Sequence, residues 1–238
     1  MGIGKLTKDL YLKENKLEVN ITQDTKWIRA LNAARRTIGK EPKPLDYEPS
    51  DKWKKTAIMA EHSPIKLVEY CISFKELRQW VGVHLLRHEH VIPQIHTQRG
   101  DRRDIIKEYP YIQKALDGVA SEIRANSNPR DFVRQGELND QDFYVNAQTL
   151  INISRRRLCN TASKETIEAW KAVVQALREN VDPIIADFLV PNCIYRGFCP
   201  EINSCGYWKS KKFKKALNDY RNLIGRGEPE PQYSSPSI

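Results

Sequence analysis

Long hydrophobic runs are missing from this chain of 238 residues. No apolar stretch approaches the roughly 20 residues that a membrane-spanning helix needs. The first residues also lack the apolar core of a secretory signal peptide. We therefore expect no membrane partner and a cytoplasmic location.

Cysteine is scarce and odd in number, with five in the chain. Without a secretory signal, this indicates a reducing compartment rather than a disulfide framework. Three follow the spacing Cys193-x5-Cys199-x5-Cys205, which is not that of a zinc ribbon or a zinc finger. With no close histidine, they could bind a metal only with a distant fourth ligand such as Cys159. Free buried thiols are the favoured interpretation, and we predict no metal site.

Acidic residues are also fewer than basic ones. The chain has 39 lysines and arginines against 30 aspartates and glutamates, a formal net charge of +9. This charge favours anionic partners. It fits either solubility with a loose attraction to nucleic acid or a pocket for phosphorylated ligands, and composition does not choose between them.

The hydrophobic content of 40% and the charged content of 29% are ordinary for a globular protein. At this length we expect a single domain over residues 1–224. It includes a cysteine-containing C-terminal extension from about residue 190. Residues 225–238, which contain prolines and serines, are predicted to be a disordered tail.

Hydrophobic periodicity predicts a mixture of strands and helices. Strands are expected at 16–22 and 65–72, and the chain around Pro93 should be extended because a proline disfavours helical geometry in the residue before it. Helices are expected at 54–60, 111–124, 164–179 and 208–224.

Two more helices are predicted from capping signals. The first should follow Asp24 or Thr25, either of which can cap its N-terminus. The second should follow a capping box formed by Ser73 and Glu76 and continue to Leu85.

Charged and titratable side chains gather where this second helix gives way to irregular chain. The stretch Leu85–Arg99 (LLRHEHVIPQIHTQR) holds two arginines, and four of the five histidines lie in or beside it. Such a transition is a common place for a ligand site.

The residues Arg87-His88-Glu89, seven residues, Thr97, one residue and Arg99 resemble the signature of the flavin-dependent thymidylate synthases. That signature reads Arg-His-Arg, seven residues, Ser, one residue, Arg. Thr97 keeps the hydroxyl, whereas Glu89 reverses a charge. Other matches follow in the family's order: Ala34-Arg35-Arg36-Thr37, Ser63-Pro64, Pro129–Arg134, and Asn146, Asn152 and Arg157. The last match implies a helix over 146–157.

The resemblance implies an α/β (α+β) fold with a largely antiparallel sheet and long helices. It also implies a homotetramer whose active sites lie between subunits. The unusual cysteine-containing end suggests a divergent, phage-like member, whose location would be the host cytoplasm.

In this family, methylenetetrahydrofolate supplies a one-carbon unit, NADPH reduces FAD, and a deoxyuridylate-type nucleotide is methylated. The resemblance implies that Arg157 stabilises charge on the pyrimidine as the catalytic residue. The nucleotide would be bound by His84, Thr97, Arg99, Arg134 and Arg157. The FAD would be contacted by Arg87, His88, Glu89, Thr37, Ser63, Asn146 and Asn152.

Several positions depart from the family pattern: Glu89, Gln148 and Thr161 stand where it has arginine, arginine and histidine. A repulsive charge at Glu89 could cost roughly a few kcal/mol in FAD binding. A pyrimidine nucleotide hydroxymethylase and a nucleotide-binding variant without flavin therefore stay open.

Two interpretations outside the family also stay open. His84 and His88 are four residues apart on the predicted helix and could bind one metal ion with His90 or His96 nearby. Nucleic-acid binding is compatible with the charge but is not favoured.

Overall fold

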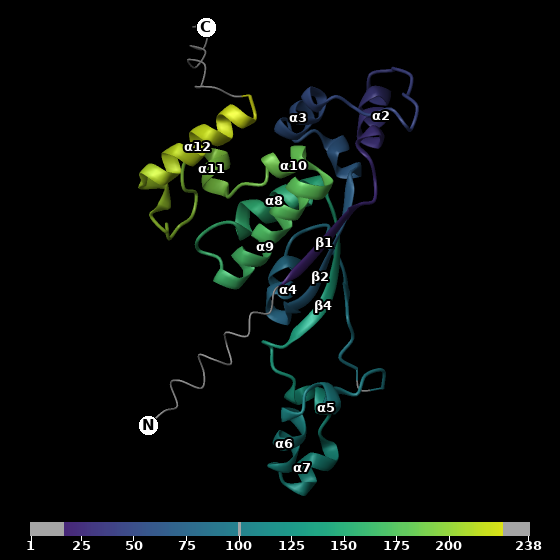
Figure 1. Cartoon of the computed structure of the whole chain (residues 1–238), viewed down its shortest axis with the longest axis vertical. Coiled ribbons are helices and arrows are strands. Elements are labelled where there is room, and N and C mark those ends of the chain that lie inside the picture. Colours follow the sequence, from purple (N-terminus) through teal and green to yellow (C-terminus); the bar gives the residue numbers. More distant parts are fainter. Residues whose placement is uncertain (1–16, 100, 226–238) are drawn as a thin grey trace, which may run out of the picture.

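A computed structural model describes residues 17–99 and 101–225. Figure 1 shows a twisted sheet in the middle of the molecule, with α8 and α9 over one of its faces and α5, α6 and α7 beyond one of its ends. No helix in these residues is both long and apolar enough to cross a membrane. The tail predicted over 225–238 lies, apart from Gly225, outside the described residues.

The described strands are β1 Glu18–Gln23, β2 Glu69–Arg78, β3 Ile92–Ile95 and β4 Leu138–Asn146. The α-helices are α2 Trp27–Thr37, α3 Asp51–Met59, α4 Gln79–Leu86, α5 Ile105–Glu108, α6 Tyr111–Asp117, α7 Ser121–Asn126, α8 Ala147–Arg157, α9 Lys164–Ala176, α10 Pro183–Asp187, α11 Asn192–Arg196 and α12 Lys211–Leu223. Shorter helical turns are η1 Ser63–Leu67, η2 Pro129–Phe132, η3 Leu177–Val181 and η4 Tyr207–Lys209.

The four strands form one antiparallel sheet in the order β1-β2-β4-β3. Alternate residues of β2, including Tyr70, Ile72 and Phe74, are buried, because successive side chains of a strand point to opposite faces. Ile72 pairs with Phe143 of β4 in the centre of the core. The predicted mixed class with an antiparallel sheet is confirmed.

The capping box predicted at Ser73 and Glu76 is wrong, because both residues lie in β2. Glu76 has a left-handed backbone (φ 57°) at a bulge, and its amide donates to the Asp140 carboxylate. The bulge keeps Leu77 buried against the core while β2 continues to Arg78. The helix therefore begins only at Gln79.

Two other predicted boundaries are also wrong. Asp24 and Thr25 do not cap α2: the Asp24 carboxylate accepts from the Thr22 hydroxyl, and the Thr25 hydroxyl donates to the Glu69 carboxylate. Their amides donate to the Glu69 carbonyl and so join this turn to β2. The N-cap is Lys26, which makes no side-chain hydrogen bond. The strand predicted from residue 65 begins at Glu69, after the turn η1.

The helix predicted at 111–124 is divided into α6 and α7, with α6 ending at Gly118. Together with α5 these helices form a small lobe around Ile105, Ile112 and Leu116. The helix expected at 146–157 is present as α8, and the extended segment at Pro93 is present as β3.

A buried carboxylate ties the main layers together. Asp182 is 4% exposed, and its Oδ2 accepts hydrogen bonds from Trp27 Nε1 at 2.6 Å and from the Tyr70 hydroxyl at 2.7 Å. Its Oδ1 caps α10 by accepting from the Ile185 amide at 3.1 Å. Burial, together with Asp182, raises the pKa of Tyr70 well above its usual value, so the hydroxyl stays a donor.

Replacement of this carboxylate should destabilise the whole domain. Asp182→Ala is expected to lower the free energy of unfolding by about 3 kcal/mol, because two buried donors and a helix cap lose their acceptor. Urea unfolding followed by circular dichroism measures this change. The control Asp117→Ala removes an exposed carboxylate and should change stability by less than about 0.5 kcal/mol. Equal effects of the two substitutions would contradict the structural role of Asp182.

Candidate nucleotide site

Arg157, the last residue of α8, contacts the end of α4. Its Nε donates to His88 Nε2 at 3.1 Å, and its Nη2 donates to the His84 carbonyl at 2.5 Å. These three residues were predicted as ligand contacts from separate parts of the sequence. The structure brings them together.

Three guanidinium groups surround the imidazole of His88. Burial lowers the pKa of His88 to about 4, helped by the positive charges of Arg157, Arg156 and Arg87. The ring is therefore neutral at physiological pH. Because Nε2 accepts from Arg157, its proton must be on Nδ1.

The positive charge at this place is only partly balanced. Arg157 is half-buried, and its polar partners are the neutral His88 ring and a carbonyl. Burial lowers its pKa, as do Arg87 and Arg156. Arg156 pairs with Glu201 at 3.2 Å, but within the described residues neither Arg87 nor Arg157 forms an ion pair. Such a cluster is suited to an anionic ligand.

The imidazole of His84 is held by α9. His84 Nδ1 lies 3.2 Å from the Thr166 hydroxyl, which in turn lies 2.7 Å from the hydroxyl of the N-cap Ser163. The ring also packs edge-on against Trp80. His84 lies in α4, but His88 follows the C-cap Arg87, so the two histidines do not share a helix as predicted. The metal site at these histidines stays a hypothesis.

The residues predicted to contact FAD are only partly gathered. Asn146 caps α8 by accepting from the Thr149 amide at 2.9 Å, and Asn152 accepts from Gln148 at 3.3 Å. Thr37 is exposed and donates to the Ala34 carbonyl. Ser63 and Glu89 are also exposed. The Glu89 carbonyl accepts from the Thr149 hydroxyl at 3.3 Å, so Glu89 lies beside the start of α8.

Sequence reasoning missed a second polar cluster beside α8, centred on Glu61. Its carboxylate forms an ion pair with Arg155 and accepts from Tyr195 at 2.8 Å and from Gln148 at 2.8 Å. Arg155 also stacks 3.7 Å from the centre of the Tyr195 ring. Burial acts to raise the pKa of Glu61, but the hydrogen bonds from Arg155 and Tyr195 outweigh it, so the net pKa is lowered. Tyr195 thereby attaches the C-terminal extension to α8.

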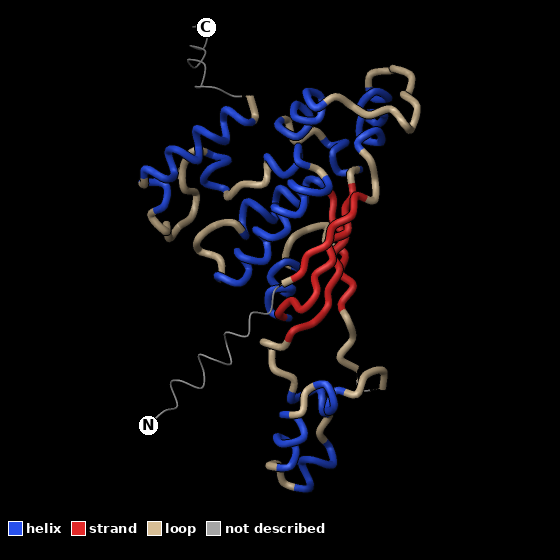
Figure 2. Tube along the Cα trace, viewed as in Figure 1, coloured by secondary structure: helices blue, strands red, loops and turns tan. Residues whose placement is uncertain are grey.

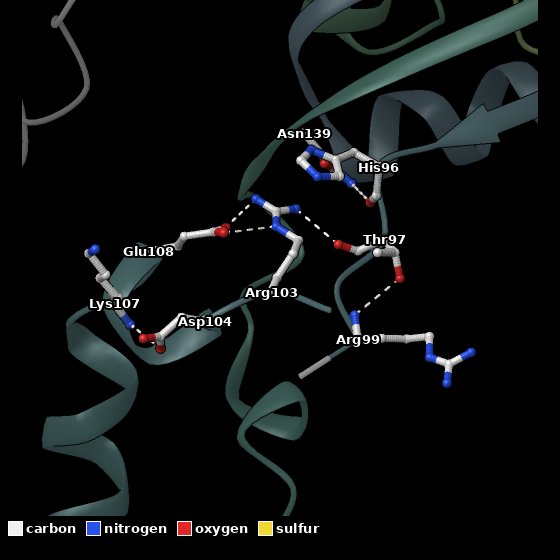
Figure 3. Close-up of polar contacts among 8 residues, drawn as sticks. All are labelled: His96, Thr97, Arg99, Arg103, Asp104, Lys107, Glu108 and Asn139. Atoms are coloured by element: carbon white, nitrogen blue, oxygen red, sulfur yellow. Dashed lines mark hydrogen bonds and ion pairs between the residues drawn. The ribbon is translucent and has the colours of Figure 1, made fainter. Parts of the chain in front are cut away.

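Thr97 and Arg99 follow β3 and lie next to the helical lobe. Thr97 Oγ1 accepts from the Arg99 amide at 3.2 Å, and the Arg99 side chain forms an exposed ion pair with Asp101 at 2.7 Å. Figure 3 shows that Arg103 reaches between the Thr97 carbonyl and Glu108, whereas the Arg99 side chain points away from it. This arrangement anchors the segment to the helical lobe.

Arg134 belongs to the same end of the molecule. Its guanidinium lies 4.2 Å from the centre of the Tyr111 ring, and its amide donates to the Tyr111 hydroxyl. Among the described residues, no hydrogen bond or ion pair joins Thr97, Arg99 or Arg134 to Arg157; their partners are Arg103, Asp101 and Tyr111.

The neutral state of His88 predicts a pH dependence. Unfolded chain takes up this proton near pH 6.5, but the folded protein only near pH 4. His88 therefore favours folding above about pH 6.5, and this contribution is lost as the pH falls toward 4. An NMR titration of histidine ring protons, with the exposed His62 as the reference signal, should show His88 titrating far below 6.5. Inorganic phosphate bound between the arginines should raise that pKa, and an ordinary value in its absence would contradict the arrangement.

A scan against models of protein families finds no match, and no curated protein matches the chain. Among solved structures, it is similar to thymidylate synthase X from Helicobacter pylori with FAD and dUMP, at 18% identity over 71% of this chain and 99% of the other, with a TM-score of 0.52. It also matches the UMP/dUMP methylase PolB from Streptomyces cacaoi bound with 5-Br dUMP, at 12% identity over 76% of this chain and 96% of that one, with a TM-score of 0.49. The first likeness shows that this chain has the fold of a flavin-dependent thymidylate synthase.

Proposed function

We propose that this protein transfers a one-carbon unit from methylenetetrahydrofolate to C5 of a deoxyuridylate-type nucleotide, with FAD as cofactor and NADPH as reductant. The observation that carries the proposal is the cluster of Arg87, His88 and Arg157. Residues matched to one family pattern from two distant stretches of the sequence meet there. Their positive charge is only partly balanced by acidic side chains. The shared fold supports the same assignment.

The chemistry of arginine suits this cluster. A guanidinium stays charged at all physiological pH values and donates paired hydrogen bonds to phosphate or carbonyl oxygens. Arg157 is held by His88 and by the His84 carbonyl, so its orientation is set before a ligand arrives. In this partly desolvated place it would stabilise negative charge that develops on the pyrimidine.

The separation of the two groups of nucleotide residues supports active sites between subunits. One subunit would offer the cluster at the end of α8, and a second would offer Thr97, Arg99 and Arg134 from its helical lobe. The side chains of Arg99 and Arg134 are exposed in a single chain, so both are accessible to such a ligand. A homotetramer is therefore part of the proposal.

The residues around α8 fit a flavin in part. Arg87 and Asn152 are exposed and offer donors for phosphate and for ring oxygens. When bound, FAD would supply hydride transfer. The protein would hold the ring and bind the nucleotide anion beside it. Glu89 is the residue that opposes FAD phosphates, which leaves a nucleotide-binding variant without flavin as the second candidate.

The first experiment is the visible absorption spectrum after incubation with FAD and removal of the excess. A bound-flavin spectrum that changes on addition of deoxyuridylate is expected. Arg157→Gln should weaken deoxyuridylate binding by about 10- to 100-fold, because a charged hydrogen-bond donor to the ligand is lost. The control Arg29→Gln removes an exposed arginine of α2 and should leave the affinity unchanged. A protein that takes up no FAD would refute the flavoenzyme, whereas nucleotide binding alone would favour the second candidate.

Glu89 gives an independent test of where the flavin lies. Removal of its charge in Glu89→Gln should tighten FAD binding by about tenfold, because a repulsion near the FAD phosphates disappears. Fluorescence quenching of FAD measures the dissociation constant. The matched control is Glu168→Gln on α9, whose carboxylate is exposed. If Glu89→Gln binds FAD no better than the control, the bound FAD does not lie next to Glu89.

A further inference from the structure

Four of the five cysteines meet at one small cavity. Cys159, Cys193, Cys199 and Cys205 all line a space of about 30 Å³ between the end of α8, the start of α11 and the loop before α12. A volume of this size has room for a single ion or water molecule. The fifth cysteine, Cys71, lies apart in β2.

The loop that carries Cys199 and Cys205 has few backbone hydrogen bonds and little apolar packing to hold its conformation. Figure 2 shows the connection from α11 to α12 mostly as loop. No backbone amide from residue 198 to residue 205, all within the described part, donates to another backbone group. Its large apolar side chains face solvent, since Phe198 is 52% and Ile202 101% exposed. Small segments without a hydrophobic core are commonly held by a metal or a disulfide.

The backbone of the loop directs its cysteines toward the cavity. Gly197 and Gly206 have left-handed backbones, with φ of 81° and 79°, a conformation that glycine adopts without steric cost. One lies two residues before Cys199 and the other directly follows Cys205. The chain therefore changes direction at both ends of the segment, and both cysteines line the cavity.

We propose that Cys159, Cys193, Cys199 and Cys205 together bind one structural zinc ion. Four thiolates are a complete tetrahedral ligand set for zinc, with Zn–S distances of about 2.3 Å. On binding, the four thiols release four protons and Zn²⁺ forms four bonds to sulfur, with no change of oxidation state. The resulting charge of −2 on the site lies near Arg156, which pairs with Glu201 at the wall of the cavity.

Binding requires the thiols to turn inward. As the side chains stand, no three metal ligands among the described residues are close enough for one ion. Cys159 Sγ lies 3.2 Å from the Thr161 hydroxyl instead. Cys193 and Cys199 line the same cavity as Cys159, so rotation of side chains is what the site requires. Metal sites of this kind are commonly completed only when the metal binds.

Because Cys159 follows α8, a bound zinc ion would connect two parts of the chain. Cys159 lies two residues after Arg157, in the turn that ends α8, whereas the other three ligands belong to the C-terminal extension. The ion would thus fix the extension to the helix end that carries the arginines. The Arg156–Glu201 ion pair crosses the same junction at 3.2 Å.

The test is the metal content of protein purified without a histidine tag, measured by inductively coupled plasma mass spectrometry. About one zinc ion per chain is expected. Cys199→Ser and Cys205→Ser, on the exposed loop, should each reduce this well below one, and the matched control Cys71→Ser should keep it. Circular dichroism of each variant shows whether the rest of the domain is folded.

Cobalt gives a readout that needs no variant. Protein stripped with a chelator and titrated with Co²⁺ should develop thiolate-to-cobalt charge-transfer bands and the strong visible bands of tetrahedral cobalt, saturating at one ion per chain. Zn²⁺ should then remove these bands by displacement. A protein without zinc and without these bands would overturn the proposal. So would a zinc content equal in wild-type protein and in the Cys199→Ser and Cys205→Ser variants.

Discussion

The carboxylate of Asp182 is the interaction on which the arrangement of the layers depends. It accepts from Trp27 at the start of α2 and from Tyr70 in β2, and it caps α10. Three segments that are distant in the sequence therefore converge on one buried negative charge. Burial of such a group is costly unless it is hydrogen-bonded, and here both carboxylate oxygens accept hydrogen bonds. The sheet and the helices above it are held in a single relative position as a result.

The three consecutive arginines at the end of α8 have different partners. Arg155 pairs with Glu61 and stacks on Tyr195, Arg156 reaches Glu201, and Arg157 meets His88. Consecutive residues of a helix point about 100° apart, so one helical turn serves the extension, the surface and the candidate site at once. The cap at Asn146 fixes where this helix begins and hence which arginine faces which partner.

Local sequence signals predicted most of the elements but failed where pairing between strands decided the outcome. Ser73 and Glu76 fit a capping box, yet β2 pairs with strands on both sides, and this outweighs a cap worth about 1 kcal/mol. The meeting of Arg157 with His88 could be anticipated from motif order alone. Glu61 could not, because its partners lie 94 and 134 positions away and a single carboxylate after a helix carries no pattern.

Pro93 favours extended geometry at Ile92, and it also affects the edge of the sheet. It lies in β3, the outer strand of the sheet, whose four residues are all exposed. An open strand edge can pair with strands of other molecules and so promote aggregation. Proline has no amide hydrogen to offer, which interrupts such pairing. The same residue that precedes Thr97 and Arg99 therefore also limits the addition of foreign strands at the edge where Ile92 and Ile95 are exposed.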